Sequence, residues 1–502
     1  MLQRARTPAK RPVFDHRSRR APGASRIAAT SFALAMALGC AGSAAQVRLP
    51  DFGDSSESVF SGAAERELGE RFMREIRASM TIVEDPEVAE YIQDLGYKLV
   101  SSTDRQSLGF NFFVVNDSAI NAFAAPGGWV GVNAGLIAAT ESESELASVV
   151  GHEIAHVTQR HIARFIERNE RSSLATLAGI LAAIAIGTQN SQAGQAAAAA
   201  VIGTQAQMQL DFSRDNEKEA DHVGMQLLDE SGFDPAAMAT FFEKLQSAGR
   251  YYRRPPEFLS THPVTTSRIA EARDRAVQFG FRQHVDGLRY GMVRAKVRVL
   301  MESDNERLLA EFSDELPRAT SAVHATGVRY GMALVKTRMG RLDEAREQFE
   351  ALAREHPDVI ILRMAIADVL LRSGKDADAL AMFRDAWRLL PDSRLVARHY
   401  AEALLRTRQP EQSLAVIEEH RRVAGADAEL MRLQAQALQA LGRTAQSQAA
   451  LAEHYYRKGE LDAAIHQLTL AAAQPENDYY HASRIEARLE ELRREHAERA
   501  RR

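Results

Sequence analysis

The sequence VVGHEIAH stands at residues 149–156 of this 502-residue chain. Histidines four residues apart lie one above the other on one face of a helix, so His152 and His156 can reach the same metal ion. Glu153 lies next to His152 and is placed to act on a water molecule activated by that ion. Two imidazoles and an adjacent carboxylate therefore predict a catalytic metal site. The competing interpretation is a surface helix that carries two ordinary histidines.

The residues that flank this motif favour a helix. Acidic side chains come early, where they suit the positive end of the helix dipole, at Glu141, Glu143 and Glu145. An apolar stripe then recurs near the helical period, at Leu146, Val149, Val150, Ile154 and Val157. Basic residues follow late, at Arg160, Arg164 and Arg168. His161 points to another side of such a continuous helix, and we expect it to be solvated.

A catalytic zinc site needs a third protein ligand and leaves one position for water. The chain has one cysteine, Cys40, so this ligand must be a histidine, aspartate or glutamate. Downstream, Glu217 and Asp221 are four residues apart and share a helix face, whereas Glu219 points elsewhere. We predict that Glu217 completes a site for one Zn²⁺ per chain and that Asp221 holds a ligand histidine through its ring N–H. A charged, solvated helix is the alternative.

The sequence NAFAAPGG at residues 121–128 precedes the histidine motif. Together with His-Glu-x-x-His and Glu-x-x-x-Asp, it makes the chain resemble the HtpX-like zinc peptidases over roughly residues 60–490. The resemblance is strongest to periplasmic members that join such a domain to C-terminal tetratricopeptide repeats. It implies a zincin-like α+β metallopeptidase domain with a small sheet, in which residues 121–125 line the cleft.

The same resemblance implies a function and partners. We expect an exported zinc-dependent endopeptidase that degrades misfolded or stalled outer-membrane proteins, with Glu153 as catalytic base. The repeats are then expected to recruit substrates or the outer-membrane assembly machinery. The alternative is a chaperone or adaptor scaffold that promotes β-barrel assembly, with proteolysis secondary.

His262 lies in the sequence LSTHP at residues 259–263, which we expect to be a loop. A lone histidine in a loop is usually solvated. The resemblance implies instead that His262 is a regulatory fourth ligand, which fills the water position and leaves the enzyme latent.

The N-terminus is typical of a targeting segment. Residues 1–26 are basic, residues 27–39 form an uncharged apolar run too short to span a bilayer, and small residues follow at 43–45. We predict a signal peptide over 1–45, a polar linker over 46–62, and a periplasmic location. Cys40 leaves open the alternative of an outer-membrane lipoprotein.

Export changes the balance of charge. Residues 1–45 carry eight basic side chains and one acidic, so their removal takes the formal net charge from −4 to −11. A mature chain this acidic has no electrostatic footprint for nucleic acid. Because Cys40 is removed as well, a signal-peptidase product has no disulfides and no thiolate-bound zinc.

The predicted peptidase domain, residues 63–285, contains both helical and strand patterns. We predict helices over 63–80, 86–100 and 235–245, and strands over 110–115 and 129–133. An exposed edge strand there can hold an extended substrate by backbone hydrogen bonds. Residues 172–210 contain no charged side chain, which favours a helical hairpin or mobile lid beside the metal site, able to contact the membrane surface, with simple burial as the alternative.

The C-terminal half repeats. Four positions recur at an offset of 34, the tetratricopeptide period: Gly340, Ala345, Phe349 and Pro357 become Gly374, Ala379, Phe383 and Pro391. A fainter unit follows around Ser413 and Ile417, and another at Gly459, Ala464, Leu468 and Pro475, where the spacing departs from 34. We therefore predict a mainly α fold in which an α-solenoid over 290–485, with one irregular unit, is followed by a charged tail over 486–502.

Overall fold

The computed structural model of the chain describes residues 62–103, 109–168, 206–251, 256–280, 284–425, 427–475 and 479–501. The predicted signal peptide, Cys40, the linker up to residue 61 and most of the 172–210 segment lie outside these residues. The described part is mainly helical with one small sheet, so the predicted fold class is confirmed. None of its helices is long and apolar enough to cross a membrane.

Two helices precede the sheet, α3 (Gly62–Ser79) and α4 (Pro86–Val100), close to their predicted bounds. Asp85 begins α4, because its Oδ1 accepts hydrogen bonds from the backbone N–H groups of Glu87 and Val88. Pro86 occupies the first turn, where no N–H donor is needed.

The sheet has three strands, β1 (Asn111–Val115), β2 (Ala122–Ala125) and β3 (Trp129–Asn133), in the order β1-β3-β2. β3 runs parallel to β1 and antiparallel to β2, and η2 (Pro126–Gly128) joins β2 to β3. The predictions of β1 and β3 are confirmed, whereas β2 was not predicted as a strand. Its AFAA sequence lacks β-branched residues, which are the usual strand signal. Among the described strands, β2 is an edge.

Three helices follow the sheet: α5 (Ala134–Ala139), α6 (Glu143–Thr158) and α7 (His161–Arg168). Ser142 caps α6 by accepting a hydrogen bond from the N–H of Glu145. The predicted continuous helix through residue 168 is wrong, because Arg160 has φ +52° and breaks the helical path between α6 and α7.

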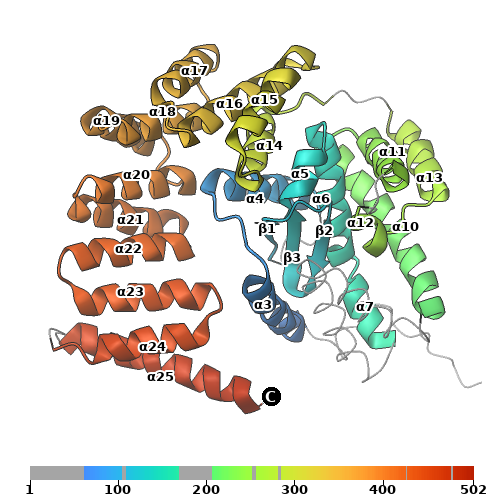
Figure 1. The fold of residues 1–502 in the computed structure, drawn as a ribbon. Helices are drawn as coiled ribbons and strands as arrows, with labels where there is room; N and C mark the ends of the chain where they lie inside the picture. Colours follow the sequence, from blue (N-terminus) through green and yellow to red (C-terminus); the bar gives the residue numbers. More distant parts are fainter. Residues whose placement is uncertain are drawn as a thin grey trace, which may run out of the picture. The chain divides into compact units, whose positions relative to one another are not determined.

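Four helices complete the peptidase part: α10 (Ala206–Glu230), α11 (Ala236–Tyr251), α12 (Phe258–Thr261) and α13 (Thr266–Phe279). α12 forms where a loop was predicted. α6 packs against the sheet and α10 packs along α6 (Figure 1). These two helices approach closely at Gly151 and Gly224, since a Cβ added at Gly224 would lie 3.1 Å from the backbone nitrogen of His152.

Helices alone build the rest of the chain. α14 (Leu288–Met301), α15 (Asn305–Glu315) and the 3₁₀ turn η4 (Leu316–Arg318) lead into paired helices (Figure 1). The pairs are α16 (Ala322–Arg338) with α17 (Leu342–Glu355), α18 (Ile360–Arg372) with α19 (Asp376–Leu389), α20 (Arg394–Arg406) with α21 (Pro410–Ala424), α22 (Ala428–Ala440) with α23 (Thr444–Arg457), and α24 (Leu461–Ala472) with α25 (Tyr479–Arg501).

The 34-residue period holds at four successive turns. The turns within successive pairs place a residue with positive φ every 34 positions, at Gly340, Gly374, Arg408 and Gly442. The departure from 34 predicted at Gly459 is confirmed, because Gly459, in the turn between α23 and α24, also has positive φ and follows Gly442 by only 17 positions. The fourth unit, α22 with α23, was not predicted, because Ser447 stands where the first two units have alanine.

A buried hydroxyl marks that substitution. Ser413 and Ser447 occupy the position of Ala345 and Ala379, where the two helices of a pair cross closely. Both serine hydroxyls donate to a backbone carbonyl of the facing helix, at 2.9 Å and 2.7 Å. α25 covers the end of the array with Ile485, Leu489 and Leu492 buried, so the charged segment after 484 is a packed helix.

Helix α14 contributes to three hydrophobic clusters, one of which joins its Ala295 and Val299 to Phe312 of α15. Its Tyr290, Val293 and Val297 belong to the hydrophobic core of the peptidase part. Met292, on another face, belongs to the core of the repeats. Lys296 of α14 also donates a hydrogen bond to the buried carboxylate of Glu87 in α4, at 2.5 Å, and Tyr330 of α16 donates to the same carboxylate at 2.8 Å.

Candidate metal centre

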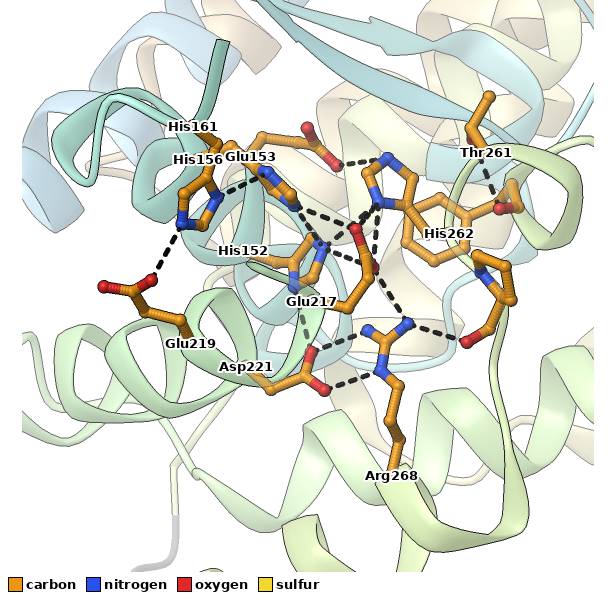
Figure 2. Close-up of polar contacts among 12 residues, drawn as sticks. His152, Glu153, His156, His161, Glu217, Glu219, Asp221, Thr261, His262 and Arg268 are labelled. Atoms are coloured by element: carbon orange, nitrogen blue, oxygen red, sulfur yellow. Dashed lines mark hydrogen bonds and ion pairs between the residues drawn. The ribbon is translucent and has the colours of Figure 1, made fainter. Parts of the chain in front are cut away.

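Four predicted side chains converge between α6, α10 and α12 (Figure 2). His152 and His156 come from α6, Glu217 from α10, and His262 follows the last turn of α12. Each offers one nitrogen or oxygen atom, and these four atoms lie within 4.8 Å of one another. His152 and Glu217 are almost fully buried, and His262 is 8% exposed.

The spacing of these atoms fits a zinc ion. Four ligands at about 2.0–2.1 Å from a tetrahedral centre are separated by about 3.3 Å. The Nε2 atoms of His152 and His156 are 3.0 Å apart, and each lies 3.4 Å from an oxygen of Glu217. Nδ1 of His262 lies 3.3 Å from Nε2 of His152 and 3.0 Å from Oε1 of Glu217.

Glu153 projects beside this cluster and is fully buried. Neither of its carboxylate oxygens has a hydrogen-bond partner among the described residues. The nearest charged or titratable contact is Nε2 of His262, 3.5 Å from Oε1. A buried carboxylate with free lone pairs is costly unless a cation, a proton donor or water satisfies it. It therefore suits a general base next to a metal ion.

Asp221 contacts the cluster from behind. Its Oδ1 lies 3.0 Å from Nδ1 of His152, the ring nitrogen turned away from the ligand atoms. Burial opposes protonation of His152, but the carboxylates of Asp221 and Glu217 outweigh it and raise the pKa of His152 to about 10. Burial likewise opposes ionisation of Asp221, and its contacts with His152 and Arg268 nevertheless lower its pKa.

Arg268 is a member of the site that the sequence analysis missed. This buried guanidinium donates from Nε and Nη2 to both oxygens of Asp221, each at 2.7 Å. Its Nη1 donates to Oε2 of Glu217 and to the carbonyl of Pro263, each at 2.9 Å. Arg268 thus fixes two carboxylates and the backbone next to His262. Nothing in its local sequence distinguishes it from the other arginines of α13.

The charges of the site fit a divalent cation. Three buried carboxylates, those of Glu153, Glu217 and Asp221, face one permanent cation, Arg268. With neutral imidazoles, a doubly charged ion would bring this set to zero net charge. Burial opposes ionisation of Glu217, yet the neighbouring His262 and the other two histidines hold its pKa well below the usual range. The donor set of imidazole and carboxylate suits zinc.

The predicted solvation of His161 is wrong. It is 4% exposed, and its Nδ1 lies 2.9 Å from Nδ1 of His156. Its Nε2 faces Oε2 of Glu219 at 3.2 Å, an oxygen that also accepts from Arg164 at 2.7 Å. Burial, followed by the charge of His156, lowers the pKa of His161 to about 4, so the ring is neutral. The prediction failed because it assumed an unbroken helix.

Comparisons with known proteins agree with this geometry. Residues 86–276 match the model of peptidase family M48. The chain is 37% identical over 309 residues to the β-barrel assembly-enhancing protease of Escherichia coli K12, which covers 62% of this chain and 63% of that protein. It is 35% identical over 343 residues to the putative β-barrel assembly-enhancing protease of Vibrio cholerae, which covers 68% of this chain and 71% of that protein.

Among solved structures, yeast Tom70 matches with a TM-score of 0.28 and 15% identity over 56% of this chain and 61% of that one. The assignment of repeats therefore rests on the 34-residue period and the helix pairs themselves. The family assignment rests on the two histidines, the two glutamates and the extent of identity to the curated relatives. The chain belongs to peptidase family M48, in the group of β-barrel assembly-enhancing proteases.

Proposed function

We propose that this chain is an exported zinc endopeptidase that degrades misfolded or stalled outer-membrane proteins in the periplasm. The observation that carries the proposal is the convergence of His152, His156 and Glu217 beside a buried Glu153 whose oxygens have no hydrogen-bond partner among the described residues. Family M48 membership supports metal-dependent peptide hydrolysis. The chain spans 63% of the length of the E. coli relative, and the name of that relative refers to β-barrel assembly.

In the proposed mechanism, His152, His156 and Glu217 hold the zinc ion. When bound, zinc supplies Lewis acidity, which lowers the pKa of water and polarises a peptide carbonyl. Glu153 accepts a proton from the attacking water and delivers it to the leaving amine nitrogen. Asp221 keeps the ring of His152 in the orientation and tautomer that present Nε2 to the ion. Arg268 in turn holds Asp221 and Glu217.

Substitution of Glu153 tests the catalytic role. Glu153→Gln keeps the shape of the side chain but removes its basicity, so cleavage of an unfolded protein such as reduced casein should fall by about 10²–10⁴-fold. Zinc content, measured by elemental mass spectrometry, should stay at one ion per chain. Glu141→Gln is the matched control, because this carboxylate is 74% exposed and its loss should leave activity unchanged. A zinc-loaded Glu153→Gln enzyme with normal activity would refute the role.

We further propose that His262 keeps the enzyme latent. Its Nδ1 stands with the other three ligand atoms, where a water molecule is needed, and its Nε2 faces Glu153. One ring therefore blocks both the water position and the base. Opening the site requires movement of α12 and the Pro263 carbonyl, which Arg268 holds.

His262→Ala should raise basal proteolysis of the casein substrate, because it vacates the water position while three ligands remain. The matched control is His466→Ala, an exposed histidine of α24 whose loss should have no effect. The latency proposal fails if folded, zinc-loaded His262→Ala cleaves at the wild-type rate or more slowly.

A chaperone or adaptor role is the second candidate. It is favoured by the extended array of paired helices and by a cavity of about 320 Å³ among α21, α22, α23, α24 and α25. Its lining mixes charged and apolar side chains, among them Glu418, Arg421, Met431, Glu453, Arg484 and Ile485. Such surfaces bind peptides or partner proteins. We propose unassembled outer-membrane proteins and their assembly machinery as these partners.

Complementation separates the two functions. In a host that lacks its own copy, Glu153→Gln should fail to restore outer-membrane integrity if proteolysis dominates, and should restore it if the array acts as a scaffold.

The location of the protein is tested by the mass of the mature N-terminus. Cleavage after residue 45 supports a soluble periplasmic protein, whereas a diacylglyceryl Cys40 supports the lipoprotein alternative.

A further inference from the structure

The two ligand histidines of α6 are supported in different ways. Behind His152, the carboxylate of Asp221 lies 3.0 Å from Nδ1, and Arg268 holds that carboxylate. Behind His156, none of the described residues places a carboxylate in direct contact with Nδ1. Its Nδ1 instead meets Nδ1 of His161 at 2.9 Å (Figure 2).

The backbone at Arg160 makes this contact possible. A continuous helix would direct residue 161 about 140° around the axis from residue 156. The left-handed conformation of Arg160, at φ +52°, ends α6 and starts α7 in a new direction, so His161 turns back against His156. A non-glycine residue in this region is strained, and such strain persists where the surroundings require it. Arg160 is also held by Glu65, at 3.8 Å.

Only one arrangement of protons satisfies all the contacts. Two imidazole nitrogens 2.9 Å apart can share one hydrogen, so one ring donates and the other accepts. If Nε2 of His156 presents its lone pair to an ion, its Nδ1 carries the hydrogen and His161 accepts it. The hydrogen of His161 then lies on Nε2, which faces the acceptor Oε2 of Glu219 at 3.2 Å.

We propose that His161 is a positioning residue that fixes the tautomer and orientation of His156, with Glu219 and Arg164 behind it. This inference rests on the proposed zinc site. His161 is not a ligand itself, because its two nitrogens face His156 and Glu219 and it stands outside the four-residue cluster. The relay replaces the direct carboxylate that usually supports a ligand histidine.

The proposal gives a meaning to the sequence EKEAD at residues 217–221. Glu217 contributes a ligand oxygen, Asp221 supports His152 directly, and Glu219 supports His156 through His161. Each supporting carboxylate is paired with an arginine from another helix, Asp221 with Arg268 of α13 and Glu219 with Arg164 of α7. α10 therefore braces both histidines of α6.

The test compares zinc affinity among variants of His161, measured by competition with a chelator on the full chain. His161→Phe fills similar volume without an acceptor and should weaken zinc binding by about 10–100-fold. His161→Asn restores an acceptor near the Nδ1 position and should stay within about threefold of wild type. His420→Phe is the matched control, because His420 is a buried histidine of α21 that bonds to a backbone carbonyl and should leave affinity unchanged.

A spectroscopic readout follows the ligand itself. With Co²⁺ in place of zinc, the visible absorption bands should change in His161→Phe and return toward wild type in His161→Asn, since they report the geometry of the bound histidines. If His161→Phe fails to fold, Glu219→Ala tests the same relay at a partly exposed position and should weaken zinc binding by about 3–10-fold.

The outcomes are distinct. Wild-type affinity in folded His161→Phe, or in Glu219→Ala, would overturn the inference. So would equal losses in His161→Phe and His161→Asn, which would indicate that only the shape of the ring matters. Failure of the wild-type chain to bind zinc at all would overturn the proposed function instead.

Discussion

Replacement of Arg268 is the most direct perturbation of the site that leaves every proposed ligand in place. Arg268→Met keeps most of the aliphatic length but removes the guanidinium. It deletes two hydrogen bonds to Asp221, one to Glu217 and one to the Pro263 carbonyl, within a pocket where Arg268 is 3% exposed. Two carboxylates are then left buried without their permanent cation.

The magnitude follows from those contacts. Removal of one partner from a buried ion pair costs about 3–5 kcal/mol. Asp221 and Glu217 both keep contacts with His152, which partly compensate, so we expect the lower end, about 3 kcal/mol. Because Arg268 and Asp221 interact directly, Arg268→Met and Asp221→Asn should not be additive. Their coupling free energy should lie between about 1 and 3 kcal/mol.

The chain offers a local reporter of unfolding. It has two tryptophans, Trp129 in β3 and Trp387 in α19, so a Trp387→Phe background leaves fluorescence from the peptidase part alone. With a urea dependence of about 2–3 kcal/mol per molar, a loss of 3 kcal/mol lowers the midpoint by about 1–1.5 M. The measurement is made in excess chelator, so that only the polypeptide is compared.

A midpoint that falls by less than about 0.5 M in Arg268→Met would refute the reasoning, because a buried ion pair of this geometry would then contribute too little. Simple additivity with Asp221→Asn would refute it in another way, by showing that the two side chains act independently. Arg273→Met is the matched control: this arginine of the same helix is 63% exposed, and its loss should change the midpoint little.

Three further predictions follow from other parts of the chain. The hydrogen bond that His284 donates to Glu143 raises the pKa of His284, so the stabilising effect of this pair is complete below the ordinary pKa of 6.5 and is lost as pH rises through the raised pKa. Burial opposes ionisation of Glu143, but His284 lowers its pKa, so its own contribution is present above 4.5 and is lost as pH falls through the lowered value. The difference in Tm between wild type and His284→Gln should therefore be largest between pH 4.5 and 6.5 and shrink by pH 9, and a constant difference would contradict this. Arg408→Gly should raise the free energy of unfolding of the repeats, followed by Trp387 fluorescence, by up to about 1 kcal/mol, because φ is +60° at Arg408 and the neighbouring units have glycine there. A clear fall in this free energy in a urea titration would contradict the prediction. When zinc is present at 100 times its Kd, its removal should lower the free energy of unfolding reported by Trp129 by about 2.7 kcal/mol and leave that reported by Trp387 unchanged. Equal changes at both tryptophans would argue against a zinc site in the peptidase domain.

Local rules explain why the centre of the site could be predicted. The spacing of His152 and His156 places both on one helix face whatever surrounds them, and Glu217 and Asp221 obey the same rule. The cap at Asp85 and the first two repeat units are equally local, since each depends on residues close in sequence. For such features, a helical period and a few residue preferences are sufficient.

Other parts depended on backbone turns and on packing between distant segments. His161 reaches His156 only because Arg160 adopts a left-handed conformation, and no neighbouring residue type predicts that conformation. Arg268 enters the site only because α13 packs beside α10. Strand β2 consists mostly of alanine, so its pairing with β3 decides its conformation more than its own preferences do.

Helix α14 has a consequence for how this protein can be divided. Because Tyr290, Val293 and Val297 complete the core against α4 and α5, a fragment that stops at residue 285 would expose an apolar surface to water. A fragment that begins at 288 would carry the same apolar side chains uncovered. A cut after α14, near residue 302, would in turn uncover Met292, which packs in the core of the repeats. Helix α14 therefore joins the catalytic and repeat halves, and a cut on either side of it leaves apolar side chains exposed to water.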